Sequence, residues 1–483
     1  MDLNPRLKSC SGEKEQSRIL GSEPVVPLVL ELGSIGNLLQ TAKFFLDLPH
    51  FVFLDNASSD PEPRFSYLTA TPFQIVRSKG KKVERMMNGI VSRVESNPFQ
   101  AIRETLARFP IKPIEGISAF QGGGVGYLAY ELGRHLEEVG YRASDDHSLP
   151  EAYLGFYDWV IAYDGQSGLS WAFATGFPEG TRKSAENRLK WIEQRLSRQV
   201  LLSPPGQRRV AEMIGSNFSR EGYIDAVSKV RDYIETGDVY QVNLSQRFEA
   251  TLPCKPWDLY CRLRSVNPAA YASFMAFPEI SILSASPELY VQMEKGLVKS
   301  KPIKGTRPRG KTVHEDRALA AELLLSEKER AENVMIVDVV RNDLGRICLP
   351  GTVAVPTLFN VEAHPTVFQM VSTVTGSTST EIDSIDLLQA IFPGASVTGA
   401  PKIRAMQIID ALEPTQRSVY CGALGYLGFD NSVCLSMPIR IMLCKEKRVY
   451  LPVGGGIVYD SDPEAEYEET LLKARGGFKA LGF

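Results

Sequence analysis

Hydrophobic and polar residues alternate in several segments of the second half of the chain, a pattern typical of β-strands that are buried on one face. In residues 239–248 the apolar side chains share one face, and Gln241 shares the other face with further polar side chains. Segments 283–291 and 437–443 repeat this division. Several strands therefore send polar groups to one side, which predicts a sheet that lines a polar cleft. An ordinary solvent-facing side remains the alternative.

The pattern of apolar runs and turns divides the chain into two main parts. Residues 1–24 are polar and indicate a flexible tail. In residues 25–200, short apolar runs alternate with Gly, Pro and Asp turns, as is typical of an α+β domain. Residues 201–216 include a Pro-Pro-Gly sequence and indicate a linker, so a second domain is expected over residues 217–483.

Two carboxylates are expected on the inner face of a predicted helix over residues 329–340. Glu332 lies in line with Met335, Ile336 and Val339 at helical spacing, and Glu329 lies one turn earlier. A buried carboxylate is costly unless it meets a cation. A divalent ion would neutralise both groups, whereas a salt bridge to Arg or Lys is the simpler alternative.

A second acidic pair follows a predicted helix start near the C-terminus. The sequence Ser-Asp-Pro-Glu at residues 461–464 is typical of a helix N-terminus, and Glu466 and Glu469 are again three residues apart. Two helices that each offer Glu-x-x-Glu could hold Mg²⁺, which prefers carboxylate oxygens.

Composition and charge exclude several classes of protein. The chain has 483 residues with a formal charge of −3, which gives no global reason to bind nucleic acid or an acidic membrane. It has no long uninterrupted apolar stretch, so no membrane span is expected. The seven cysteines form no C-x-x-C pair, which favours a reducing cytoplasm over a disulfide framework.

A basic segment and a glycine run are candidates for binding an anion. Residues 299–310 are rich in Lys and Arg, and their prolines favour an extended chain on which Lys304 and Thr306 point the same way. A desolvated lysine can act as a nucleophile. Gly454, Gly455 and Gly456 could present backbone N–H groups to an anion. A basic surface loop and a hairpin bulge are the corresponding structural alternatives.

Taken in order, these segments resemble the chorismate-utilising enzymes, in particular the aminodeoxychorismate synthases and the anthranilate synthases. The resemblance covers most of the chain. It is carried by GDVYQVNLSQ (237–246), SASPELY (284–290), KPIKGTRPRG (301–310), RAENVMIVDVVRNDLGRI (330–347), FPGASVTGAPKIRAM (392–406), GALGYLGF (422–429) and GGGIVYDSDPEAEYEET (454–470).

The resemblance implies a fold and a set of roles. The expected fold is α+β, with two intertwined domains whose antiparallel sheets form a central β-sandwich flanked by helices, and with residues 217–483 as the chorismate-binding catalytic domain. Glu332 and Glu469 match the Mg²⁺ ligands, with Glu329 and Glu466 as supports through water. Glu288 matches the general acid. The substrate carboxylates would be held at Gly305, Thr306, Tyr426, Arg440 and Gly454–Gly456.

Two positions bear on the reaction. Relatives that add water at C2 of chorismate resemble one another in having a Lys where this chain has Gln241, so a nitrogen nucleophile is expected here. The PIKGT sequence resembles the aminodeoxychorismate synthases, in which Lys304 would attack C2 while Glu288 protonates the departing C4 hydroxyl. Ammonia would then give 4-amino-4-deoxychorismate, a precursor of 4-aminobenzoate and folate.

The resemblance also implies partners and leaves alternatives. A separate glutamine amidotransferase would supply ammonia, and regions around residues 54–67 and 267–271 resemble those that form a tryptophan pocket in relatives. Gln369 stands where the family usually has His. The alternative functions are an anthranilate synthase and a catalytically impaired chorismate-binding protein.

Overall fold

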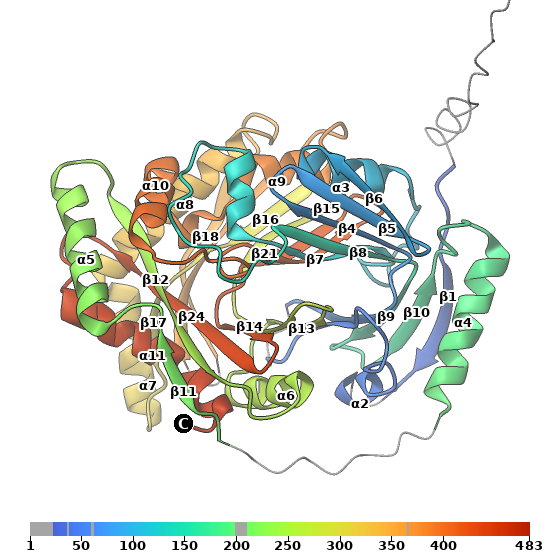
Figure 1. The fold of residues 1–483 in the computed structure, drawn as a ribbon, viewed down its shortest axis with the longest axis horizontal. Coiled ribbons are helices and arrows are strands. Elements are labelled where there is room, and N and C mark those ends of the chain that lie inside the picture. Colours follow the sequence, from blue (N-terminus) through green and yellow to red (C-terminus); the bar gives the residue numbers. More distant parts are fainter. Residues whose placement is uncertain (1–22, 36–37, 59–61, 199–209, 365–366) are drawn as a thin grey trace, which may run out of the picture.

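The computed structural model shows an α+β fold built on two large antiparallel sheets (Figure 1). It describes residues 23–35, 38–58, 62–198, 210–364 and 367–483. Nearly all of the expected tail, and the first part of the expected linker, lie outside these residues. The last residues of the expected linker instead form a strand, β11 (Met213–Ser216).

The first sheet has 12 strands and combines both halves of the chain. Its strands follow one another in the order β1 (Leu28–Gly33), β10 (Ser170–Ala174), β9 (Trp159–Asp164), β3 (Phe65–Thr69), β2 (Val52–Asp55), β13 (Tyr271–Ala276), β14 (Ser281–Ser286), β23 (Ile441–Lys445), β24 (Arg448–Ile457), β12 (Gln241–Thr251) and β11, with β20 (Gly399–Ala400) paired to β12.

The second sheet also has 12 strands from both halves. The order is β17 (Ile303–Pro308), β19 (Val367–Ser377), β16 (Leu297–Lys301), β15 (Leu289–Glu294), β22 (Val433–Ser436), β21 (Ala423–Gly428), β7 (Gly123–Leu128), β8 (Ala152–Tyr157), β4 (Gln74–Lys79), β5 (Lys82–Met87) and β6 (Ile90–Glu95), with β18 (Ala354–Ala363) paired to β19.

The largest hydrophobic core lies between the sheets, as the alternation along β9 illustrates. Val160 and Ala162 belong to the core cluster shared by both sheets. Trp159 and Ile161, on the opposite face of the strand, belong to a second cluster that packs against helices. The expected β-sandwich is therefore confirmed, and each half of the chain contributes to both of its layers.

Helices cover the outer faces and the ends of the sandwich. Figure 1 shows α4 beside β1 and β10 at one end, and α5, α7 and α11 gathered at the other. The helices are α2 (Leu38–Ala42), α3 (Pro98–Ala107), α4 (Arg182–Leu196), α5 (Arg220–Glu235), α6 (Pro256–Val266), α7 (Val313–Leu325), α8 (Glu327–Gly345), α9 (Ser384–Ile391), α10 (Lys402–Leu412) and α11 (Pro463–Leu481), with short 3₁₀ turns η1 (Tyr130–His135) and η2 (Ala395–Val397).

Two helix starts follow directly from the sequence. Ser219 caps α5, since its side chain accepts a hydrogen bond from the Gly222 amide. Asp462 caps α11 in the same way, with Pro463 in the first turn. Among the described residues no helix is long and apolar enough to cross a membrane. All six cysteines that the structure describes are free thiols, as their spacing predicted.

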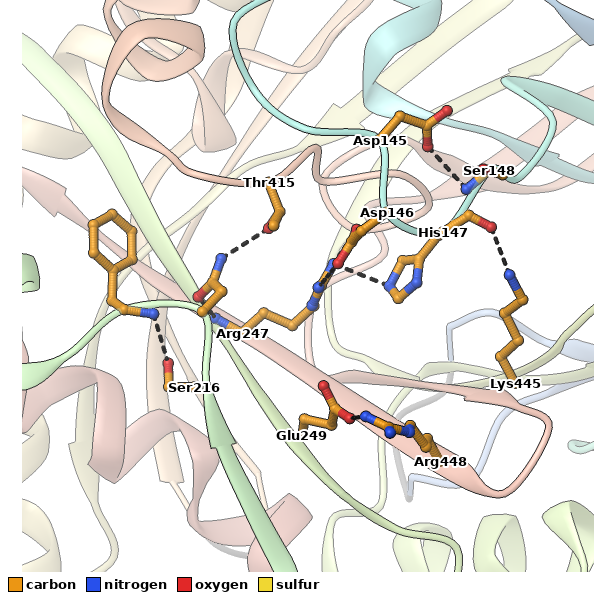
Figure 2. Close-up of polar contacts among 12 residues, drawn as sticks. Asp145, Asp146, His147, Ser148, Ser216, Arg247, Glu249, Thr415, Lys445 and Arg448 are labelled. Atoms are coloured by element: carbon orange, nitrogen blue, oxygen red, sulfur yellow. Dashed lines mark hydrogen bonds and ion pairs between the residues drawn. The ribbon is translucent and has the colours of Figure 1, made fainter.

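A polar cluster ties the loop before β8 to the first sheet. Figure 2 shows Arg247 of β12 between Asp146, with which it forms an ion pair, and the His147 ring. The Arg247 guanidinium donates to His147 Nε2 over 3.0 Å, and Lys445 Nζ donates to the His147 carbonyl over 2.7 Å. Both halves of the chain are therefore joined by side chains as well as by strand pairing.

Candidate active site

Lys304 lies among charged groups that are far apart in the sequence. Its ammonium donates a hydrogen bond to the Ser396 carbonyl in η2 over 3.1 Å. Burial lowers the pKa of Lys304, while the nearby carboxylates of Glu332, Glu288 and Glu469 act in the opposite direction. The structure thus brings the expected nucleophile, the expected acid and both expected metal ligands into one neighbourhood.

The strand that carries Lys304 is interrupted by a bulge. Gly305 has a φ of +82°, and the pairing of β17 with β19 shifts register between Ile303 and Thr306. The positive φ favours glycine at this position, and a Cβ there would also lie 2.8 Å from Glu329 Oε2. The bulge breaks the alternation from which we expected Lys304 and Thr306 to point the same way, and Thr306 is exposed whereas Lys304 is half-buried.

Glu288 occupies a crossing between the two sheets. It lies after β14 in the first sheet and directly before β15 in the second, so residues 283–291 form two strands and not one continuous strand. The side chain is buried, and burial raises the pKa of Glu288 to about 7, with Ser396 and Lys304 opposing the rise. A carboxyl with this pKa can carry a proton near neutral pH and donate it.

Arg440 occupies a second crossing between the sheets. It precedes β23 with a φ of +55°, so the expected strand over residues 437–443 begins only at Ile441. The guanidinium donates to the Lys473 carbonyl over 2.8 Å. Burial lowers the pKa of Arg440, and the nearby Tyr420 and Glu469 oppose this shift. Arg440 is therefore a half-buried cation within electrostatic reach of the expected metal ligand Glu469.

The four expected metal-site carboxylates come from α8 and α11, as predicted. Burial raises the pKa of Glu332, and Glu329 and Glu469 contribute to the rise. Lys473 lies 2.5 Å from Glu469 and lowers the pKa of that carboxyl. Glu466 accepts a hydrogen bond from Ser461 over 2.6 Å. The carboxylate pair of α8 and the carboxylate pair of α11 therefore face the same region, but their side chains interact with different groups.

The carboxylates fit a hard divalent cation by their chemistry. In the part of the chain that the structure describes, no three His, Cys, Asp or Glu side chains converge closely enough to form a metal site. A Cβ at Gly455 would lie 3.3 Å from Glu466 Oε2 and 3.6 Å from Glu469 Oε1, so both carboxylates approach the glycine run. Burial is the main cause of the raised pKa of Glu332, and the nearby Lys304 opposes it. Mg²⁺ would offset the cost of burying these carboxylates by binding their oxygens.

Gln241 and Gly456 also lie beside Lys304. The Gln241 side-chain nitrogen donates to Glu332 Oε2 over 3.5 Å, and Gln241 Oε1 is buried without a hydrogen-bond partner among the described residues. A Cβ at Gly456 would lie 2.2 Å from Gln241 Nε2 and 3.7 Å from Lys304 Nζ. Because Gln241 and Ser245 are both buried, the solvent-facing alternative for this strand face is wrong.

Tyr426 lies apart from this group, among aromatic side chains. Its ring stacks on Phe120 at 4.3 Å between centroids and meets Tyr67 edge-on at 5.6 Å. With Tyr67 and Tyr271 it lines a cavity of about 750 Å³. These are the regions in which the sequence resembled a tryptophan pocket.

Three residues near the site were not singled out from the sequence. Tyr420 is buried and interacts with Arg440, Ser396 contacts both Lys304 and Glu288, and Lys473 pairs with Glu469. Tyr420 and Ser396 stand in or next to the motifs that carry the resemblance, which was the only available signal. Gln369, at the family's usual His position, is buried on β19 opposite Thr306.

Comparisons with known proteins agree with this arrangement. The chain is 37% identical over 436 residues to aminodeoxychorismate synthase component 1 of Escherichia coli, covering 90% of this chain and 94% of that protein. It is 38% identical over 431 residues to anthranilate synthase component 1 of Acetivibrio thermocellus, covering 86% and 87%. The crystal structure of anthranilate synthase component I from Streptococcus pneumoniae TIGR4 matches with a TM-score of 0.79 and 31% identity, over 87% of this chain and 93% of that one.

The fold, the site and the relatives lead to the same family. The family model described as "chorismate binding enzyme" matches residues 57–477, which span nearly the whole described part of the chain. The chain belongs to the chorismate-binding enzyme family.

Proposed function

We propose that this chain is the chorismate-converting component of an aminodeoxychorismate synthase. In the presence of Mg²⁺ it converts chorismate and ammonia to 4-amino-4-deoxychorismate, on the route to 4-aminobenzoate and folate. The observation that carries the proposal is the position of Lys304. Its amine lies within electrostatic reach of the buried acid Glu288 and of both metal-site helices. Relatives named aminodeoxychorismate synthase component 1 support the same reaction.

Local cations and N–H groups would hold the dianionic substrate. The chain carries only a small net charge, so a doubly negative ligand needs positive groups close to the site. Arg440 supplies a half-buried cation, and Gly456 supplies backbone next to Gln241 and Lys304. Gly305 and Thr306 would add backbone and hydroxyl donors at the bulge of β17. Tyr420, and not Tyr426, is the phenol placed beside Arg440.

The covalent role of Lys304 explains an amination at C4. The neutral amine attacks C2 and becomes a secondary ammonium, and both ring double bonds shift by one position. The C4–O bond breaks as Glu288 transfers its proton to the departing hydroxyl, which leaves as water. Ammonia then forms a bond to C4, both double bonds shift back, and the C2–N bond breaks to release the neutral Lys304 amine. The new ammonium group gives up a proton to solvent. Burial favours the neutral amine of Lys304 and the protonated form of Glu288, as both roles require.

Glu332 and Glu469 would hold Mg²⁺ directly, with Glu329 and Glu466 acting through water. The bound ion would neutralise a carboxylate of chorismate and so lower the charge density of the site. Arg440 would orient the substrate. Gln241 would place a neutral amide at the position where relatives that add water have a basic lysine. The names of relatives as "component 1" point to a second component, which we propose is the glutamine amidotransferase that supplies ammonia.

Anthranilate synthesis is the second candidate, because relatives with that name are equally similar. Both reactions begin with the same substrate and acid, and they differ in the carbon that receives nitrogen. Lys304 favours amination at C4, because its amine would be bonded to C2 while ammonia attacks the ring. A chorismate-binding protein without turnover is a third possibility, suggested only by Gln369.

Product identification tests the proposal. The purified chain is incubated with chorismate, MgCl₂ and an ammonium salt at mildly alkaline pH, and products are separated and identified by mass and absorption spectrum. We expect the non-aromatic 4-amino-4-deoxychorismate. Fluorescent anthranilate as the main product would replace the proposal by the second candidate, and binding of chorismate without any consumption would replace it by the third.

A further inference from the structure

A small internal cavity borders the proposed acid, Glu288. It has a volume of about 20 Å³, and its polar lining residues are Glu288, Tyr290, Ser300, Asp343 and Ser396. A cavity above about 10–15 Å³ can hold one water molecule when polar partners line it. The size and the lining therefore fit a single ordered water next to Glu288.

Tyr290 supplies a buried polar group that has no partner in the described part of the chain. Tyr290 lines the same cavity as Glu288, which lies two residues earlier in the chain. Its hydroxyl oxygen is buried and has no hydrogen-bond partner among the described residues. A buried hydroxyl without a partner is costly, and one water in the cavity would remove that cost. Burial, and secondly the nearby Asp343 carboxylate, raise the pKa of Tyr290, so the phenol keeps its proton.

Asp343 stands between this cavity and the protein surface. Besides the small cavity, it borders an open groove of about 1190 Å³, which is also lined by Asn342, Arg346 and Lys402. Lys402 Nζ donates to Asp343 Oδ2 over 2.6 Å and to the Ile391 carbonyl over 3.0 Å. This ion pair holds the carboxylate of Asp343 in place at the end of α8.

We propose, as an extension of the proposed function, that Asp343 and a water in this cavity form a proton path from the surface groove to Glu288. Tyr290 is a positioning residue in this path, because its hydroxyl fixes the water. Lys402 is a second positioning residue, which fixes the Asp343 carboxylate. The path connects Glu288 to solvent through Asp343. Bulk water therefore does not need to enter the substrate site to return the proton.

The proton balance of the path is simple. In each turnover Glu288 gives one proton to the leaving hydroxyl and becomes a carboxylate. The cavity water gives a proton to Glu288 and receives one from the Asp343 carboxyl, which takes one from an acid of the solvent in the groove. One proton enters for each proton consumed, and Lys402 keeps its charge. The other titratable or charged groups that face the path are Lys304 and Cys421 at Glu288 and Arg346 at Asp343.

The decisive variant is Asp343→Asn in the full chain. Consumption of chorismate with ammonium and Mg²⁺ is followed as a function of pH, of small carboxylic acid buffers and of solvent deuterium. We expect kcat to fall by about tenfold or more, with KM for chorismate changed by less than about twofold, because general acid catalysis is worth about 10²–10⁴ in rate. The solvent isotope effect on kcat should increase, and formate buffer should partly restore kcat.

Two further variants separate the path from a structural effect. Tyr290→Phe removes only the hydroxyl and should lower kcat in the same direction, with a larger solvent isotope effect and an intact fold. Asp338→Asn is the matched control, because Asp338 is exposed on the same helix, borders the same groove and pairs with the nearby Arg341. This control should keep the wild-type kcat and isotope effect.

Specific outcomes would overturn the proposal. Asp343→Asn with wild-type kcat and isotope effect excludes the path, and so does a loss of kcat that formate does not rescue and that leaves the isotope effect unchanged. If Asp343→Asn fails to fold, an unaltered kcat and isotope effect in Tyr290→Phe excludes the path. The identity of the wild-type product decides the proposed function separately, because the path is measured as a ratio of chorismate consumption between variant and wild type.

Discussion

Gln241 donates a hydrogen bond from its side-chain nitrogen to Glu332 Oε2 over 3.5 Å, which places a neutral amide between the metal-site helix and Lys304. A cation at this place would pair with Glu332 and compete with Lys304 for the same carboxylate. We expect Gln241→Lys to lower C4 amination by about tenfold or more, the loss of rate that one misplaced catalytic group produces. The measurement is the rate of 4-amino-4-deoxychorismate formation, with water addition at C2 monitored as a side reaction. Gln241→Met serves as the neutral control, and an equal loss in both variants would contradict the charge effect.

Lys304 is expected to decide which carbon receives nitrogen. Lys304→Ala removes the amine that would occupy C2, so C4 amination should become undetectable, while some amination at C2 can appear from free ammonia. Product analysis by mass and by anthranilate fluorescence measures both outcomes. Lys301→Ala is the matched control on the same segment, since Lys301 instead pairs with Glu362. Unchanged C4 product from Lys304→Ala would rule out the covalent role.

The carboxylates of α8 and α11 are expected to set the Mg²⁺ requirement. Glu332→Gln and Glu469→Gln each remove one negative charge from the proposed metal site, so a higher Mg²⁺ concentration should be needed for half-maximal activity. Glu468→Gln, an exposed neighbour on α11, should leave the requirement unchanged. Activity is titrated with Mg²⁺ after treatment with a chelator. Full activity of the wild-type chain in excess chelator would contradict the proposed cofactor.

Glu288 should impose a pH limit on turnover. Burial raises its pKa to about 7 in the free protein, and the proposed acid works only while it carries its proton. The value of kcat/KM should therefore fall as pH rises through about 7, with Lys304 acting in the opposite sense if its amine must be neutral. Glu288→Gln should lower kcat by about 10²–10⁴. The check is the pH profile of wild-type kcat/KM, and a profile without a limb near pH 7 would contradict the assignment.

His147 should make the fold sensitive to acid. Burial and the adjacent Arg247 lower the pKa of His147 from 6.5 to about 4 (Figure 2). Between these values the unfolded chain binds a proton that the folded chain does not, so the free energy of unfolding should decrease as pH falls from about 6.5 toward 4. Urea unfolding across this range measures the slope. His147→Gln should flatten it, whereas the exposed His314→Gln should not.

Local features of the fold could be predicted from the sequence, and long-range ones depended on the family resemblance. The two Glu-x-x-Glu helices, and the cap of the C-terminal one, follow from periodicity and composition, and the structure confirms both helices. The crossings at Glu288 and Arg440 could not be predicted, because alternation continues through them although the chain changes sheets. The bulge at Gly305 was missed for a related reason, since strand periodicity assumes regular pairing. Tyr420 stands just before the motif that contains Tyr426, six residues away, and only the packing separates their surroundings.

The division of both sheets between the two halves of the chain restricts how such a protein can be recombined. The halves meet along two seams, where β2 pairs with β13 in one sheet and β7 pairs with β21 in the other. A chimera that takes residues 25–200 from a relative must therefore match two hydrogen-bonded registers and their facing side chains at once. Exchange of loops or outer helices leaves both seams intact. Relatives with this architecture should therefore differ more in these outer segments than in the strands that pair along the seams.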